Sequence, residues 1–99
     1  MKIIPYINLE EKEEKHYFEG EMFTGIAEAK NEDGSKYYEY RYKDGLLHGP
    51  TVKWLEDGSI SHVIIYQEGK RKEIKFPHQL NEKEIESYNR RQTGQIQSS

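Results

Sequence analysis

The chain has 99 residues, of which 33% are hydrophobic and 33% are charged, and its formal net charge is -3. This length fits one domain, and so few apolar residues exclude a thick hydrophobic core. The chain has no cysteine, which excludes disulfides and thiolate metal sites and is compatible with a reducing cytoplasm.

The first sixteen residues divide into an apolar and an acidic part. Ile3, Ile4, Tyr6, Ile7 and Leu9 predict a leading strand or an extended arm beside the first hairpin. Pro5 and Asn8 interrupt this run, which is also too short for a signal sequence or a membrane span, so we expect a soluble cytoplasmic protein. The acidic run over residues 10–15 is typical of a solvated connector.

A tandem repeat with a period of 24 residues follows. Residues 32–35 (Glu-Asp-Gly-Ser) recur unchanged as residues 56–59, and the same shift carries Tyr42 onto Tyr66 and Gly45 onto Gly69. Asp-Gly between runs rich in Tyr, Val, Ile and Thr predicts β-hairpins with type I′ turns, whose two central residues both need positive φ. Such pairs stand at 33–34, 44–45 and 57–58, and Glu-Gly pairs at 19–20 and 68–69 mark the flanking turns. The expected strands cover residues 23–30, 36–43, 50–56, 60–66 and 70–76.

These turns also predict which residues face each other across the hairpins. Tyr38, Tyr40 and Tyr42 are expected opposite Ala29, Ala27 and Gly25, and Tyr66 opposite Gly49, so that each ring lies over a small residue. His62 is expected to pair with Lys53. One pair argues against this register, because Glu28 would face Glu39, which is unfavourable unless a lysine intervenes.

The C-terminal part predicts a helix over residues 82–92. Asn81 and Glu84 form a variant capping box at its start. The helix has a thin apolar stripe, Ile85 and Tyr88 with Leu80 just before it, so it needs a surface to cover. We expect it to dock on the most apolar face of the second hairpin. That face carries Pro50, Val52, Trp54, Val63 and Ile65. Residues 93–99, which follow the helix, are expected to form a frayed tail.

Charge is distributed unevenly along the chain. Residues 1–35 carry nine Asp and Glu against four Lys, whereas residues 70–91 carry seven Lys and Arg against four Glu. The net negative charge argues against nucleic acid as a partner, and membrane contact is possible but not favoured. An acidic N-terminal half suits a basic protein partner, because complementary fields speed encounter.

Catalysis has no support in the sequence. It has no nucleophile elbow, phosphate-binding loop or metal-ligand spacing, so we expect neither an enzyme nor a cofactor or metal site. The four histidines are scattered along the sequence, and we expect them to be surface residues. The residues that we expect to bind a partner are Glu10, Glu11, Glu13, Glu14, Tyr38, Tyr40 and His62. For Tyr38 and Tyr40 a framework role is the alternative, because repeat tyrosines usually serve the fold.

The repeat resembles the MORN-type repeat, in the variant found in small bacterial proteins often described as antitoxins. The matching stretches are residues 17–25, 42–50 and 54–58, with the order Tyr-Lys-Asp-Gly, His-Gly and Trp. The resemblance covers roughly residues 17–73 and implies an elongated single sheet of hairpins. The third unit departs from the pattern, because Glu73 stands where glycine is expected, so the flanks must supply stability.

The sequence therefore predicts a mainly β fold: a single antiparallel meander sheet of about two 24-residue repeats, with a short C-terminal α-helix. As domain organisation we expect an N-terminal arm (1–16), a repeat sheet (17–76) and a helix (80–92) within a single domain. Two functions remain open. The first, implied by the resemblance, is an antitoxin or immunity protein that occludes a cognate toxin. The acidic N-terminal half would suit a basic toxin. The second is a structural scaffold for self-association or membrane-surface contact. The oligomeric state is left open.

Overall fold

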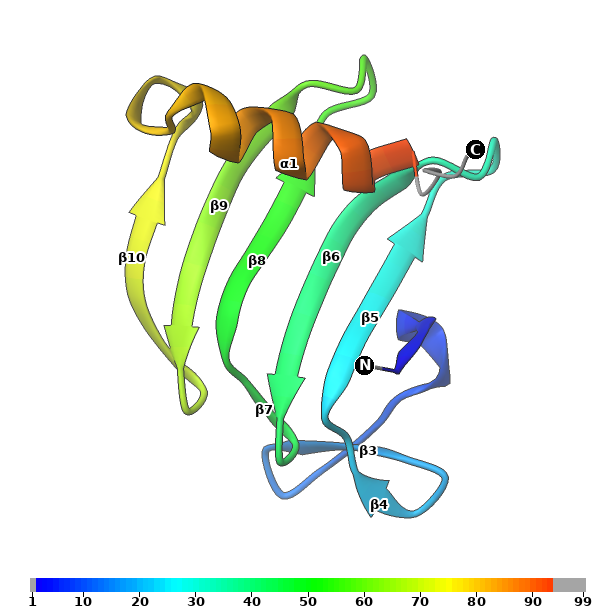
Figure 1. The fold of residues 1–99 in the computed structure, drawn as a ribbon. Coiled ribbons are helices and arrows are strands. Elements are labelled where there is room, and N and C mark those ends of the chain that lie inside the picture. The colour runs from blue at the N-terminus through cyan, green and yellow to red at the C-terminus, as the bar shows by residue number, and fades with distance from the viewer. Residues whose placement is uncertain (1, 94–99) are drawn as a thin grey trace.

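A computed structural model describes residues 2–93 of the chain and is mainly β, with antiparallel hairpins and one C-terminal helix (Figure 1). In chain order the elements are β1 (Ile3–Pro5), the 3-10 helix η1 (Tyr6–Asn8), β2 (Glu10–Lys12), β3 (Lys15–Phe18), β4 (Glu21–Met22), β5 (Gly25–Lys30), β6 (Lys36–Lys43), β7 (Leu46–Leu47), β8 (Gly49–Trp54), β9 (Ile60–Gln67), β10 (Lys70–Lys75), the 3-10 helix η2 (Pro77–Gln79) and α1 (Glu82–Thr93). The expected mainly β fold class is confirmed.

The main sheet has the strand order β1-β5-β6-β8-β9-β10, with β7 paired to β6. From β5 to β10 it is the predicted meander, and the residue pairs predicted within the β5–β6 and β8–β9 hairpins are present. Tyr38, Tyr40 and Tyr42 lie opposite Ala29, Ala27 and Gly25, Tyr66 lies opposite Gly49, and His62 lies opposite Lys53. The pairing of Glu28 with Glu39 is present as well.

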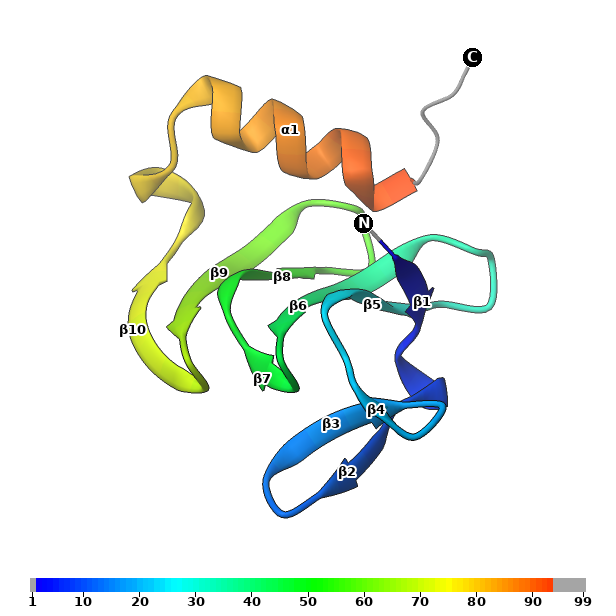
Figure 2. The ribbon, with the colours of Figure 1, turned by 60° about the horizontal axis from the view of Figure 1, so that its bottom comes forward.

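The expectation of one antiparallel sheet is wrong in two respects. β1 pairs with β5 in the parallel direction, so Ile3, Ile4 and Pro5 extend the main sheet at its edge. In addition, β2, β3 and β4 form a second, three-stranded antiparallel sheet. This small sheet, which we call the acidic lobe (residues 10–22), projects below the main sheet in Figure 2. The acidic run is therefore a β-hairpin and not a connector, and the lobe crosses the predicted boundary between residues 16 and 17.

The turns follow two designs. At residues 44–45 and 68–69 both central residues have positive φ (51° and 83°, 49° and 84°), as a type I′ turn requires. At Asp33 and Asp57 that prediction is wrong, because only the following Gly34 and Gly58 have positive φ. Each aspartate instead accepts hydrogen bonds from the backbone and the hydroxyl of the serine two residues later, at 2.9 and 2.6 Å. A β-bulge in each hairpin absorbs the longer turn and preserves the register.

The helix docks where the sequence predicted. Figure 1 shows α1 lying across β9, β8 and β6. We call this side of the main sheet the helix face. Ile85 and Tyr88 pack there against a buried cluster formed by Val52, Trp54, Ile60, Val63 and Leu80. The capping box is also confirmed, because the Asn81 amide donates to the Glu84 carboxylate at 2.9 Å and the Glu84 amide donates to Asn81 Oδ1 at 2.8 Å.

The opposite side, which we call the tyrosine face, has a second core. Ile4, Phe23, Ala27 and Tyr42 are buried there. Partly buried side chains pack around them, namely Tyr6, Leu9, Phe18, Tyr40 and Leu47. The N-terminal arm thus packs on the tyrosine face, opposite the face that α1 covers. Both flanks of the repeat therefore contribute to the stability of the sheet. Of the tail expected at residues 93–99, Thr93 is the last residue of α1 and the rest lies outside the described residues.

No helix within residues 2–93 is long and apolar enough to cross a membrane.

Candidate partner-binding surface

The acidic lobe carries four of the residues expected to bind a partner. β2 pairs with β3, so that Glu10 lies opposite Tyr17 and Glu11 opposite His16. Glu13 and Glu14 form the connecting turn, and both have positive φ (54° and 68°). All four glutamates are exposed. Six glutamates and two lysines lie in residues 10–22, so the lobe presents net negative charge to solvent.

Backbone hydrogen bonds fasten the lobe to the main sheet. The His16 amide donates to the carbonyl of Gly45 at 2.8 Å, the Gly45 amide donates to that of Phe23 at 2.9 Å, and the Phe23 amide donates to that of His16 at 3.1 Å. The approach favours glycine at position 45, because φ there is +83° and a Cβ would lie 3.1 Å from the His16 carbonyl oxygen. The glutamates therefore stand on a fixed support, which lowers the entropy cost of binding through them.

Tyr38 and Tyr40 lie on the tyrosine face, away from the turn of the lobe. Tyr40 stacks on Tyr6 with ring centroids 4.5 Å apart and on Tyr38 at 5.0 Å. Burial raises the pKa of the Tyr40 hydroxyl, and neighbouring tyrosines add to the shift. The Tyr38 ring lies under Lys53 Nζ at 5.5 Å. Both rings are half-buried, and Tyr40 packs against the second core, so its contacts are those of a framework residue.

His62 lies farther along the same face, outside the acidic lobe. Its Nδ1 atom is 3.0 Å from the hydroxyl of Ser61, and its ring meets Phe76 edge-on at a centroid distance of 6.4 Å. Partial burial lowers the pKa of His62, and the charge of Lys53 lowers it further. The imidazole is therefore neutral at physiological pH and brings no charge to this face.

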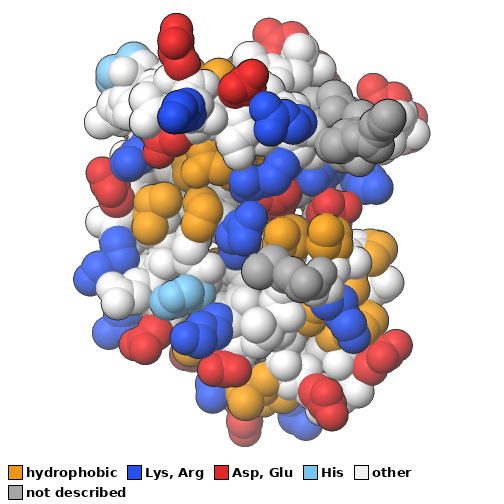
Figure 3. Space-filling view, in the orientation of Figure 1, with side chains coloured by type: hydrophobic (Ala, Val, Ile, Leu, Met, Phe, Trp, Pro, Cys, Tyr) orange, Lys and Arg blue, Asp and Glu red, His pale blue; other side chains and the backbone are white. Residues whose placement is uncertain are grey.

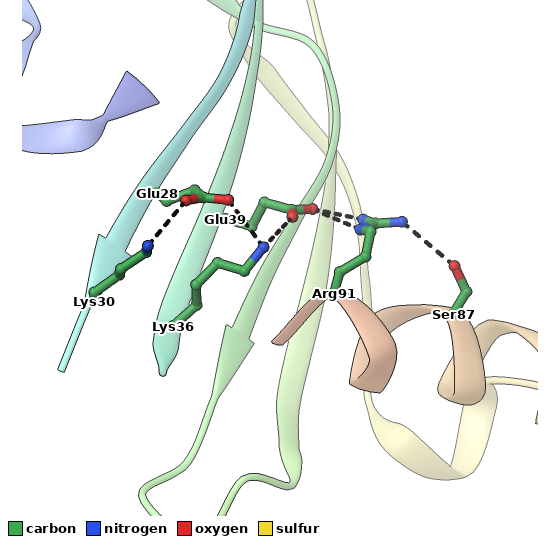
Figure 4. A network of polar contacts seen from close by, with 6 residues as sticks. All are labelled: Glu28, Lys30, Lys36, Glu39, Ser87 and Arg91. Atoms are coloured by element: carbon green, nitrogen blue, oxygen red, sulfur yellow. Dashed lines mark hydrogen bonds and ion pairs between the residues drawn. The ribbon is translucent and has the colours of Figure 1, made fainter. Parts of the chain in front are cut away.

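A buried ion network joins α1 to β5 and β6 (Figure 4). Glu39, which is 1% exposed, accepts hydrogen bonds from Nε and Nη2 of Arg91 at 3.0 and 2.6 Å. Lys36 Nζ donates to Glu39 at 3.1 Å and to Glu28 at 3.0 Å. Lys36 is thus the intervening lysine that the Glu28–Glu39 pair required. Burial alone would raise the pKa of the Glu39 carboxyl, but Arg91, together with Lys36, outweighs it and holds that pKa below its ordinary value.

The role of Arg91 is not among the predictions from the sequence. A signal was present, because the strand alternation puts Glu39 opposite Val52, on the apolar side of the sheet. A carboxylate there needs a cationic partner. The helix predicted to cover that side carries Arg90 and Arg91 in its last turn, although periodicity alone does not choose between them.

The opposite charge gathers on the outer strand β10. Lys70, Arg71 and Lys72 are exposed there, whereas Lys75 lies 3.9 Å from the carboxylate of Glu84 on α1. The pairing of β10 with β9 is interrupted by a bulge between Arg71 and Glu73. Lysines and a bulge on an outer strand hinder the addition of further strands. This edge is consequently protected against aggregation.

Within residues 2–93, no group of three or more His, Asp or Glu side chains is arranged to hold a metal ion.

Comparison with protein-family models gave no match, and neither did searches of curated proteins and of solved structures.

Proposed function

We propose that this protein is a non-enzymatic module that binds a basic protein partner through its acidic lobe, and that it acts as an antitoxin or immunity protein by occluding a toxin. The observation that carries the proposal is the exposure of Glu10, Glu11, Glu13 and Glu14 on a hairpin fixed to the main sheet. Fixed surface charge of one sign steers a partner of the opposite sign and selects against others.

The conformation of the lobe turn supports a role for its charge. Type I′ turns favour Asn, Asp and Gly at their central positions, because these residues adopt positive φ most readily. Glu13 and Glu14 occupy both positions here, and Glu19 occupies the first position of the β3–β4 turn. Each such residue costs on the order of 1 kcal/mol. Glu68 holds the same first position in the β9–β10 turn, so Glu19 follows the turn pattern of the repeat, whereas among residues 2–93 only the lobe turn has glutamate at both central positions, and this pair supports a role for its charge.

A capture experiment tests the proposal. The tagged protein is used as bait in an extract of its native host, beside a variant in which Glu10, Glu11, Glu13 and Glu14 are replaced by lysine. The matched control reverses four exposed glutamates outside the lobe, namely Glu32, Glu56, Glu73 and Glu86. We expect a basic protein to be retained by the wild type and the control and to be absent from the lobe variant. Equal recovery on all three baits would refute the role of the lobe.

A scaffold that self-associates is the second candidate. One observation favours it: the acidic lobe and the basic strand β10 are complementary surfaces of the same chain. Two copies could therefore attract each other head to tail. Sedimentation velocity separates the two functions, because the scaffold requires oligomers that dissociate with added salt, whereas the module requires a heterologous partner.

A further inference from the structure

An apolar groove lies at the outer edge of the main sheet, beside β1. Its volume is about 740 Å³, within the range of sites that hold a peptide side chain or a small ligand. Its lining includes Ile3, Pro5 and Ile7 from the N-terminal arm, Ala29 and Lys30 from β5, and Tyr37 from β6. Figure 3 shows hydrophobic side chains gathered below the right-hand end of α1, on the side of the molecule where β1 lies.

Several of these side chains are exposed to an unusual degree. Ile7 is 87% exposed, Ile3 57% and Tyr37 39%, which makes them three of the six large hydrophobic side chains exposed on the described residues. Single exposed apolar residues need no explanation, but three around one groove indicate a contact surface.

The groove also holds an open stretch of strand edge. The Ile26 amide donates to the Lys2 carbonyl at 2.9 Å, so the polar backbone groups of Ile26 face β1. By the alternation of a β-strand, those of Glu28 and Lys30 face the same way. The pairing of β1 with β5 ends at Pro5 and Glu28, yet β5 continues to Lys30. Among residues 2–93 no strand pairs with Lys30 on that side, and an extended segment could hydrogen-bond there.

The charge beside the groove selects the kind of segment. The charged residues that line the groove, Glu28 and Lys30, pair with each other at 3.8 Å, so the excess negative charge comes from the acidic lobe. The chain passes from β1 through η1 directly into β2, and exposed Ile7 is followed three and four residues later by Glu10 and Glu11. In Figure 2 the lobe lies immediately below β1 and η1. An apolar centre beside a charged rim is the usual anatomy of a protein interface.

We propose that this groove receives an extended segment of a protein partner by strand addition at Lys30, with an apolar side chain against Ile7 and Tyr37 and basic side chains toward Glu10 and Glu11. The inference rests on the proposed function only for the charge of the partner. It adds the site, the backbone pairing and the apolar anchor, which charge steering does not require.

A defined peptide tests the inference on the full chain. The probe is an acetylated hexapeptide of alternating valine and lysine, titrated into isotope-labelled protein while the amide signals are followed by NMR. We expect the largest shifts at Ile3, Lys30 and Tyr37. A version whose backbone nitrogens are methylated cannot pair with a strand edge, and a version with glutamate for lysine meets like charge, so both should bind at least about tenfold more weakly.

Variants locate the apolar anchor. Ile7→Ala should weaken binding of the valine–lysine peptide about tenfold, as expected for an interface anchor. Leu55→Ala is the matched control, because Leu55 is also exposed (48%) but lies in the turn between β8 and β9. Thermal melts confirm that both variants fold.

Three results would overturn the inference: no shift at the groove, shifts confined to β10, or equal binding of the methylated peptide. Any of these would leave the capture experiment with the lobe variant unaffected. Conversely, groove binding that does not distinguish lysine from glutamate would retain the site but contradict a basic partner. Failure of the groove and failure of the proposed function are thus separate results.

Discussion

Arg91 in the last turn of α1 donates two hydrogen bonds to Oε1 of Glu39 in β6, at 3.0 and 2.6 Å, across 52 positions of the sequence. Together with the apolar contacts of Ile85 and Tyr88, this pair fixes the position of the helix on the sheet. A charged pair at a buried position is sensitive to the loss of either partner, because the remaining charge cannot be hydrated.

Removal of Arg91 should therefore destabilise the protein. Arg91→Ala leaves Glu39 with Lys36 alone, and we expect the free energy of unfolding to fall by about 1–3 kcal/mol, less than for a fully buried pair because Arg91 is partly exposed. Arg90→Ala is the control, since the Arg90 side chain is 60% exposed and its pair with Glu86 measures 3.6 Å. Urea denaturation of the two variants compares them, and equal losses would show that the Arg91–Glu39 pair does not hold the helix.

The same carboxylate predicts how stability depends on pH. The pKa of Glu39 is lower in the folded protein than its ordinary value of 4.5, so ionised Glu39 stabilises the fold above that value. This contribution is lost as the pH falls through the folded-state pKa. Glu39→Gln, which cannot ionise, should be less stable than the wild type at neutral pH and should lose less further stability between pH 7 and about pH 3. Parallel urea midpoints for both proteins over that range would contradict the assignment.

Two glycines with positive φ should respond differently to alanine. Gly58→Ala meets only the strain of φ +90°, because a Cβ there has nothing within 4 Å, and should cost about 1 kcal/mol. At Gly25, φ is +150° and a Cβ would lie 2.4 Å from the Lys2 carbonyl oxygen. Gly25→Ala must displace Lys2, the residue that precedes β1, and should cost on the order of 3 kcal/mol. Thermal melts measure both, and an equal decrease in melting temperature would show that the contact with Lys2 does not restrict position 25.

Deletion of residues 80–99 tests the second role of α1, which is to cover an apolar face. Val52, Trp54 and Val63 would be uncovered, and exposed apolar sheet faces promote association. We expect light scattering to detect oligomers or aggregates of the truncated chain. The full-length Tyr88→Ala variant, which retains the helix, should remain as monodisperse as the wild type. A monodisperse truncated chain would mean that the helix is not needed to shield this face.

Much of the main sheet could be predicted because its information is local. The 24-residue period, the Asp-Gly and Glu-Gly pairs and the tyrosines over small residues define the hairpins and their register. The turn at Asp33 differs from the predicted type because the hydrogen bond between Asp33 and Ser35 decides its conformation. The bulge next to the turn restores the predicted register in the rest of the hairpin.

What could not be predicted depends on contacts between distant segments. The lobe turn at Glu13 and Glu14 carries no glycine or asparagine, so no turn signal marks the β2–β3 hairpin. The parallel pairing of β1 with β5 joins segments that no repeat relates, so the sequence predicts a strand or an arm at residues 3–9 but not its partner. The seven residues expected to bind a partner do not form one site, because Tyr38, Tyr40 and His62 lie on the main sheet, whereas the four glutamates lie on the lobe.

The most direct test of the account is the association rate constant of the captured partner, measured by surface plasmon resonance as a function of salt concentration. Reversal of Glu10, Glu11, Glu13 and Glu14 to lysine should slow association and reduce its salt dependence, with the melting temperature nearly unchanged because the four side chains are exposed. Reversal of Glu32, Glu56, Glu73 and Glu86 should change the rate far less. If both reversals slow association equally, net charge alone steers the partner, and the acidic lobe is not its binding site.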